Sequence, residues 1–176
     1  LNSPDPFSSI ERLVRRIGDR ATVGAGTVLD PEDVRRLAEI GAELVVSPHV
    51  DADVIAATVA HGMVASPGFF TPTEAFRAIA SGASVLKLFP AEAATPKVLK
   101  SQLAVIPPHV PVLAVGGISP DTIEPWLAAG AAGFGLGSGL YTAGLDPDEV
   151  RRRAERYAAA VKAVPADRRP PPRWLR

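Results

Sequence analysis

The stretch Ser84-Val85-Leu86-Lys87-Leu88-Phe89-Pro90 places a lysine at the centre of a short apolar run that a proline ends. A run of this kind predicts a buried strand. Because side chains alternate between the two faces of a strand, Lys87 is predicted to share a face with Val85 and Phe89. An amine on such an apolar wall has a lowered pKa and becomes a nucleophile toward carbonyls. The alternative is a lysine at a strand end whose ammonium reaches solvent.

Lysine is rare in the chain, which favours the first interpretation. Of the nineteen Lys and Arg residues only four are lysines: Lys87, Lys97, Lys100 and Lys162. An arginine could not act as the nucleophile, because its guanidinium group stays protonated.

Length and composition bound the class of protein. The 176 residues correspond to one domain of ordinary size. Nineteen basic and nineteen acidic residues balance, so no nucleic acid or anionic membrane is expected as a partner and a small molecule is favoured. The chain has no cysteine, which excludes disulfides and thiolate metal sites and fits a reducing compartment. No apolar run approaches the ~20 residues of a membrane span, and the N-terminus does not resemble a signal peptide, so we expect a cytoplasmic protein.

Short strands alternate regularly with helices along the chain. Strands are predicted at 21–28, 44–47, 63–66, 85–89, 110–115 and 133–137, and helices at 4–18, 31–40, 51–61, 72–80, 96–105, 120–129 and 147–164. Asp5 or Ser3 is expected to cap the first helix. This alternation predicts an α/β protein with a parallel sheet, and the glycines at strand ends favour a (β/α)8 TIM barrel over an open six-stranded sheet. Six strands are visible where a barrel has eight, so we expect the first strand, first helix and second strand to be lacking.

The chain divides into a barrel domain at 1–164 and a tail at 165–176. The tail, P-A-D-R-R-P-P-P-R-W-L-R, is rich in proline and arginine. Such a composition cannot bury enough apolar surface to fold alone, so the tail is predicted to be disordered.

Glycines follow the last two predicted strands. In barrels the working face lies at the C-terminal ends of the strands, where Gly116-Gly117 and Gly137-Ser138 are expected. Their backbone N–H groups and one hydroxyl could hold a phosphate; the alternative is that the glycines only permit tight turns. Thr27 is a further strand-end hydroxyl, suited to a carboxylate or carbonyl, whereas Glu92 is expected to be a solvated loop residue. No His and carboxylate cluster has metal-ligand spacing, so no metal site is predicted.

Four segments carry a resemblance to a known family. They are V-G-A-G-T-V-L (23–29), G-A-x-x-L-K-L-F-P (82–90), A-V-G-G-I-S-P (114–120) and G-L-G-S-G-L-Y-x-A-G (135–144). In these segments the chain resembles the 2-keto-3-deoxy-6-phospho-sugar-acid aldolases. The opening residues 1–4 and Ala114-Val115 are most similar to the galactonate branch, although Ser66 stands where that branch often has cysteine.

The resemblance implies a class I aldolase that needs no cofactor. Lys87 would form a Schiff base with the keto group, Phe89 would pack beside the imine, and Thr27 and Pro48 would line the pyruvate pocket. The phosphate would be held by Gly116, Gly117, Gly137 and Ser138. The implied partners are a phosphorylated keto-deoxy sugar acid, pyruvate and glyceraldehyde 3-phosphate, and the implied assembly is a homotrimer.

The resemblance also implies functional residues upstream of Leu1, namely the glutamate that acts as general base and a substrate-binding arginine. We therefore expect the parent protein to be the aldolase and this chain to lack full activity. Three alternatives remain open from the sequence. They are an aldolase of the gluconate branch, a truncated barrel that binds phosphates without catalysis, and another phosphate-binding barrel enzyme, which would not need Lys87.

Overall fold

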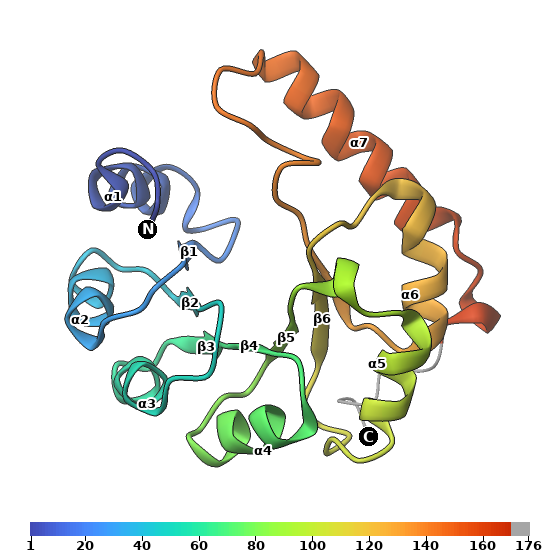
Figure 1. The fold of residues 1–176 in the computed structure, drawn as a ribbon. Coiled ribbons are helices and arrows are strands. Elements are labelled where there is room, and N and C mark those ends of the chain that lie inside the picture. The colour runs from blue at the N-terminus through green and yellow to red at the C-terminus, as the bar shows by residue number, and fades with distance from the viewer. Residues whose placement is uncertain (170–176) are drawn as a thin grey trace. The chain divides into compact units, whose positions relative to one another are not determined.

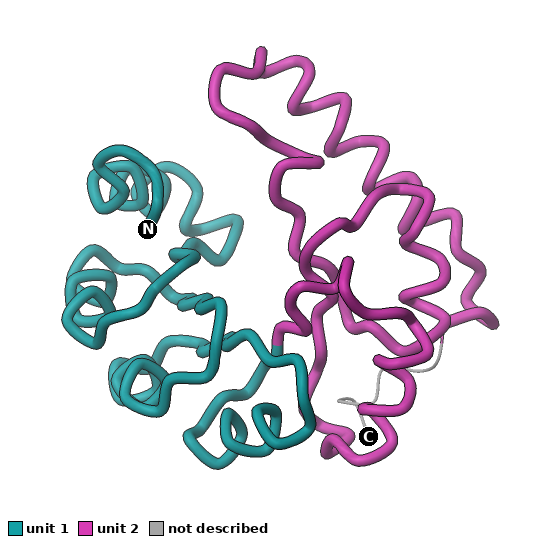
Figure 2. Tube along the Cα trace, in the orientation of Figure 1, with its two compact units in different colours: residues 1–86 teal, residues 87–176 magenta. Residues whose placement is uncertain are grey.

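The computed structural model describes residues 1–169. The chain forms two compact units, which meet in sequence between Leu86 and Lys87 (Figure 2). Strand β5 (Leu86–Leu88) carries the chain from the first unit to the second.

The first unit is built on a parallel sheet of three short strands in the order β1-β2-β3. In register, Gly26 of β1 lies opposite Val46 of β2, and Val46 lies opposite Ser66 of β3. The elements of this unit, labelled in Figure 1, are α1 (Pro6–Ile17), β1 (Gly24–Gly26), α2 (Pro31–Glu39), β2 (Leu44–Val46), α3 (Ala52–Ala60), β3 (Val64–Ser66), β4 (Gly68–Phe69) and α4 (Pro72–Ala80).

The second unit holds β5, β6 and β7 as consecutive neighbours in a sheet. Strands β6 and β7 are parallel, with Leu113 opposite Gly133 and Val115 opposite Gly135. The elements of this unit are η1 (Ala91–Ala93), α5 (Pro96–Leu103), β6 (Val112–Val115), η2 (Pro120–Thr122), α6 (Ile123–Ala129), β7 (Gly133–Gly135), α7 (Pro147–Ala163) and η3 (Ala166–Arg168).

The predicted fold class is confirmed: parallel strands alternate with helices in the expected order. Each predicted strand is present but shorter than its apolar run. Strand β4 is not among the strands predicted from the sequence. It forms because Gly68 packs where a Cβ would overlap the carbonyl of Pro48, while its N–H donates to the carbonyl of Ser47 at 3.0 Å.

Capping side chains determine where most helices begin. Asp30, Asp51, Thr71, Thr95 and Asp146 each accept a hydrogen bond from a backbone N–H in the first turn of the helix that follows. Such bonds satisfy donors that have no partner within the helix. Except in α3, a proline stands at the start of each of these helices, where its missing N–H costs nothing.

The first helix differs from the prediction. Asp5 occupies the capping position of α1, but its φ is 40° and its side chain makes no capping hydrogen bond. The carboxylate therefore does not cap the helix. Pro6 still provides a favourable first residue.

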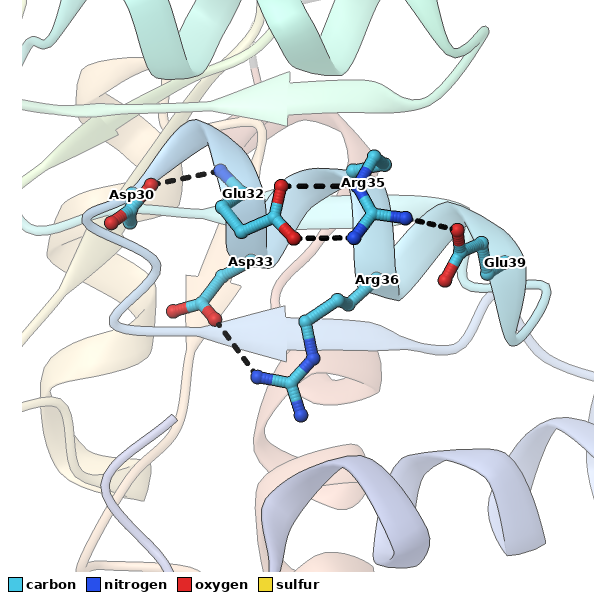
Figure 3. A network of polar contacts seen from close by, with 6 residues as sticks. All are labelled: Asp30, Glu32, Asp33, Arg35, Arg36 and Glu39. Carbon is cyan, nitrogen blue, oxygen red and sulfur yellow. Dashed lines mark hydrogen bonds and ion pairs between the residues drawn. The ribbon is translucent and has the colours of Figure 1, made fainter.

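Ion pairs between side chains of α2 lie on its exposed face, as Figure 3 shows. Arg35 bridges Glu32 and Glu39, and Arg36 lies 3.5 Å from Asp33. The guanidinium of Arg36 also lies 3.7 Å from the centre of the Phe7 ring, which joins α2 to α1. The apolar side chains Ile10 of α1, Val34 and Leu37 of α2 and Val54 of α3 share one buried core with Val45 of β2.

The predicted tail falls partly outside the described residues, at 170–176. Within its first residues, Ala166–Arg168 form the turn η3, and Arg168 lies 2.6 Å from Glu124 of α6. Among residues 1–169, no helix combines the length and apolar character needed to cross a lipid bilayer.

Candidate active site

Lys87 is the central residue of β5 and lies inside the protein. Its side chain is 8% exposed, and its neighbours Leu86 and Leu88 are fully buried. Burial lowers the pKa of Lys87, because water no longer stabilises its ammonium form. A larger fraction of this amine is therefore neutral near pH 7 than for a lysine in water, and the neutral amine is the nucleophilic form.

Phe89 lies on the same face of the strand as Lys87. The Nζ atom of Lys87 is 4.1 Å from the centre of the Phe89 ring, as the alternation of side chains predicts. The face of an aromatic ring carries partial negative charge and attracts a cation. A positively charged nitrogen on Lys87, either an ammonium or an iminium, is therefore stabilised by this ring.

The glycine pair after β6 packs against the chain that follows Lys87. Gly116 has φ +106° and Gly117 has φ +65°, conformations that favour glycine. A Cβ on Gly116 would lie 3.3 Å from the nitrogen of Ala91, and one on Gly117 would lie 2.7 Å from the Cβ of Glu92. Glycine is therefore required here both by backbone conformation and by the close approach of η1. The contact with Glu92 was missed from sequence, since nothing in the local pattern relates η1 to β6.

The second glycine loop begins at the same edge of the sheet. Because β6 and β7 are parallel with Val115 opposite Gly135, residues 116–117 and 136–138 leave the two strands side by side. The N–H groups of Leu140 and Tyr141 both donate to the carbonyl of Gly137, at 2.9 and 3.0 Å. This turn leaves Gly137 and Ser138 exposed. Exposed glycine loops at neighbouring strand ends can present backbone N–H groups to one anion.

Thr27 and Pro48 belong to the first unit. They follow β1 and β2, whose last residues Gly26 and Val46 are opposite each other. Both therefore lie at the C-terminal edge of that sheet. Thr27 has φ +58°, the left-handed conformation, which is rare for a β-branched residue. Strain of this kind gathers at functional positions.

Tyr157 was not singled out from the sequence, where it is one residue of the last predicted helix. In the structure it is 6% exposed, and its hydroxyl donates a hydrogen bond to the carbonyl of Ile118 at 2.9 Å. Ile118 directly follows the first glycine pair. The contact joins positions 39 residues apart, so no short sequence pattern could have revealed it.

Within residues 1–169, no group of three or more His, Cys, Asp or Glu side chains is placed to hold a metal ion. The chemistry available in the second unit is that of a buried amine, an aromatic ring and two exposed glycine loops. A buried amine adds to carbonyl carbons, and loops of this kind bind phosphate. Such a combination is suited to an α/β enzyme that acts on a phosphorylated carbonyl compound.

The comparison with protein families agrees with this class. The family model described as KDPG and KHG aldolase matches residues 1–155, and the chain belongs to this family.

Two curated relatives are each 47% identical to the chain. One is the 2-dehydro-3-deoxy-6-phosphogalactonate aldolase of Escherichia coli (strain K12), matched over 93% of this chain and 78% of the relative. The other is a probable 2-dehydro-3-deoxy-6-phosphogalactonate aldolase of Rhizobium meliloti (strain 1021), matched over 93% and 77%. A solved structure described as native KDPGal has a TM-score of 0.90 and 43% identity, covering 92% of this chain and 78% of that one.

Proposed function

We propose that this protein is a class I aldolase that cleaves 2-dehydro-3-deoxy-6-phosphogalactonate to pyruvate and glyceraldehyde 3-phosphate. The observation that carries the proposal is the placement of Lys87, a buried amine with a lowered pKa on a strand of this fold. Membership of the aldolase family and the two relatives at 47% identity support the reaction and the substrate.

The chemistry begins with the neutral amine of Lys87. Its Nζ attacks the C2 carbonyl of the substrate, and uptake of one proton from solvent with loss of water gives a protonated imine; the final hydrolysis returns that proton. The hydroxyl on C4 loses its proton as the C3–C4 bond breaks, and the electron pair of that bond moves toward the iminium to form an enamine. Glyceraldehyde 3-phosphate leaves, C3 takes up a proton, and water releases pyruvate and the free lysine. The positive nitrogen is the electron sink, and the Phe89 ring at 4.1 Å favours that charge.

The phosphate is assigned to the two glycine loops. Gly116, Gly117, Gly137 and Ser138 are proposed to bind it through backbone N–H groups and the Ser138 hydroxyl. Their origin at neighbouring parallel strand ends and the exposure of the second loop support this role. Thr27 and Pro48 keep the pyruvate-binding roles that the family resemblance implies, and the strained φ of Thr27 supports its part.

The wider setting of the activity is also a proposal. We expect residues 1–164 to act as one catalytic domain. The family resemblance implies that the protein assembles as a homotrimer. The cysteine-free composition favours a cytoplasmic activity. Analytical ultracentrifugation tests the trimer, which requires a sedimenting mass three times the 18.4 kDa of the chain.

Trapping with pyruvate and borohydride tests the lysine directly. Reduction of an imine between Lys87 and pyruvate leaves a stable adduct that peptide mass spectrometry locates. We expect the adduct on Lys87 in the parent and in a Lys97→Met control, which removes an exposed lysine of α5, and no adduct in Lys87→Met. An adduct distributed over several lysines, or none in a folded parent, contradicts the proposal.

A second assay concerns the substrate. The 6-phosphates of the galactonate and gluconate forms of the keto-deoxy acid are supplied separately, and glyceraldehyde 3-phosphate is measured with a coupled dehydrogenase. A higher kcat/KM for the galactonate form is expected. Preference for the gluconate form would leave the lysine chemistry unaffected and would show that the substrate is the gluconate form instead of the galactonate form.

A further inference from the structure

We propose that Tyr157 of α7 is a positioning residue that joins the two glycine loops and holds them in a phosphate-binding arrangement. The inference rests on the proposed function, because it concerns the phosphate site assigned above. Tyr157 is buried, and the proposed role acts through the two loops and not through contact with the substrate.

The first half of the argument is the hydrogen bond to Ile118. The Tyr157 hydroxyl donates to the Ile118 carbonyl at 2.9 Å, and Ile118 is itself 8% exposed. Ile118 follows Gly117 directly, so this bond fixes the end of the Gly116-Gly117 turn. Glycines have more backbone freedom than any other residue, and an anchor at the end of the pair restricts that freedom.

The second half is the contact with Gly139, which follows Ser138. A Cβ on Gly139 would overlap the hydroxyl oxygen of Tyr157, and its next neighbours would be the Ile118 carbonyl and the Tyr157 Cζ, both at 3.5 Å. The same hydroxyl group therefore lies against the second loop while it bonds to the first. Tyr157 brings residues that follow β6 and residues that follow β7 into contact with one side chain.

Helix α7 makes a further contact with the second loop. Arg153, one turn before Tyr157, donates from Nη1 to the carbonyl of Ser138 at 3.5 Å. The guanidinium of Arg153 is itself held by Glu149, with Nε 2.8 Å from Oε1. Two side chains of one helix thus contact the loops. We therefore expect α7 to hold the two loops in a fixed position relative to each other.

This arrangement matters for anion binding because backbone N–H groups are useful only when they point at the same place. Affinity rises when the binding groups are already held in the bound conformation. Loss of the Tyr157 hydroxyl should therefore weaken phosphate binding even though the hydroxyl is not a ligand.

The test compares Tyr157→Phe with Tyr141→Phe. Tyr141 is the other tyrosine in the sequence and its side chain is 59% exposed, so Tyr141→Phe removes the same hydroxyl from a solvent-facing position. The dissociation constant of inorganic phosphate is measured by NMR titration, and pyruvate trapping is measured in parallel. We expect Tyr157→Phe to raise the dissociation constant about fivefold, the effect of one hydrogen bond, with the yield of the pyruvate adduct unchanged. Tyr141→Phe should leave both unchanged.

A second pair of variants tests the contact with Gly139 and does not depend on how well Tyr157→Phe folds. Gly139→Ala should weaken phosphate binding, because its Cβ overlaps the Tyr157 hydroxyl. In the Tyr157→Phe background the same substitution should have a much smaller effect, because the remaining neighbours are at contact distance. Such non-additivity is the mark of two residues that act on each other.

The outcomes separate this inference from the proposed function. An unchanged phosphate affinity in Tyr157→Phe, or additive effects of the Gly139 and Tyr157 substitutions, overturns the positioning role and leaves the aldolase proposal intact. Absence of a pyruvate adduct in the parent, with phosphate binding sensitive to Tyr157, overturns the lysine chemistry and supports the positioning role.

Discussion

The Nζ atom of Lys87 lies 4.1 Å from the centre of the Phe89 ring. Two effects oppose each other at this nitrogen. The ring favours the charged form, and burial disfavours it. The pKa of Lys87 is lowered by desolvation, so burial dominates for the free amine. In the proposed imine, the same ring would favour the positive charge on which carbon–carbon cleavage depends.

The lowered pKa of Lys87 predicts how trapping and stability depend on pH. The rate of pyruvate trapping should rise with pH and reach half its maximum below the ordinary lysine pKa, because the neutral amine attacks. The pKa of Lys87 is lowered in the folded state and ordinary in the unfolded state. At pH values between the two, the unfolded chain binds more protons than the folded chain, so the free energy of unfolding rises with pH. Melting temperatures should therefore show Lys87→Met to be more stable than the parent at low pH, with an advantage that shrinks toward the ordinary pKa. An advantage that grows with pH would contradict the buried-amine assignment.

Phe89→Leu should slow the lysine chemistry. Loss of the ring removes an attraction worth about 0.5–2 kcal/mol, which corresponds to a rate of imine-dependent cleavage about 2- to 30-fold lower. The midpoint of the trapping profile should move to lower pH, because the ammonium loses a favourable contact. Phe76→Leu is the control, since Phe76 is 46% exposed on α4. A midpoint that moves to higher pH would show that the ring does not act on the charge.

Gly117 and Gly137 should respond differently to alanine. At Gly117 the left-handed conformation and the approach of Glu92 both oppose a Cβ, so Gly117→Ala should lower the melting temperature and weaken phosphate binding. At Gly137 no atom lies within 4 Å of the position a Cβ would take. Gly137→Ala should therefore keep its melting temperature and raise only the KM of the phosphorylated substrate. Unchanged KM would mean that the phosphate does not approach this loop.

Thr27 is predicted to lower the folding stability of the protein while its hydroxyl contributes to pyruvate binding. Thr27→Gly relieves a left-handed conformation that costs about 1–2 kcal/mol and adds some chain entropy to the unfolded state, for a net gain of about 0.5–1 kcal/mol. Thr27→Ala keeps the Cβ and should show no such gain. Both variants lose the hydroxyl and should bind pyruvate more weakly. Denaturant unfolding and a pyruvate titration measure the two effects, and full pyruvate affinity in both variants would exclude the hydroxyl from the pocket.

Ser66 offers a test of packing in the first unit. Its hydroxyl is buried and makes no hydrogen bond among the described residues, a situation that costs about 1–3 kcal/mol. A thiol is easier to bury, so Ser66→Cys should raise the melting temperature by a few degrees. Ser47→Cys is the matched control, because the equally buried Ser47 hydroxyl donates to the His49 carbonyl at 2.9 Å. That variant should melt lower than the parent, and a rise in both would point to cavity filling instead.

Helix starts and the lysine strand could be predicted because their causes are local. Asp30-Pro31 and Thr71-Pro72 determine where helices begin through bonds to the next few residues. Asp5 shows the limit of such reasoning, since a capping residue type at the right position makes no cap when its backbone turns left-handed.

The features missed from sequence depend on distant residues. Strand β4 forms where Gly68 approaches the backbone of Pro48. Glu92 lies close to Gly117 although α5 and β6 separate the two residues in the chain. The Tyr157 hydroxyl finds the carbonyl of Ile118 in the same way. Periodicity describes which face of an element is apolar, but it does not say which backbone atoms another element will bring within reach.

The capping side chains have a consequence for how this protein can evolve. Asp30 caps the first turn of α2 and Pro31 stands at its start, so the residues that start this helix lie outside 27–29. The same holds for the segment between β5 and Thr95, which begins α5. Mutations in such connecting segments alter what meets the substrate without removing the signal that starts the helix. Natural selection can therefore change the residues that meet the substrate one connecting segment at a time. Mutant libraries confined to exposed positions such as Thr27 and Leu29, with the fully buried Val28 left unchanged, should retain a high proportion of folded members.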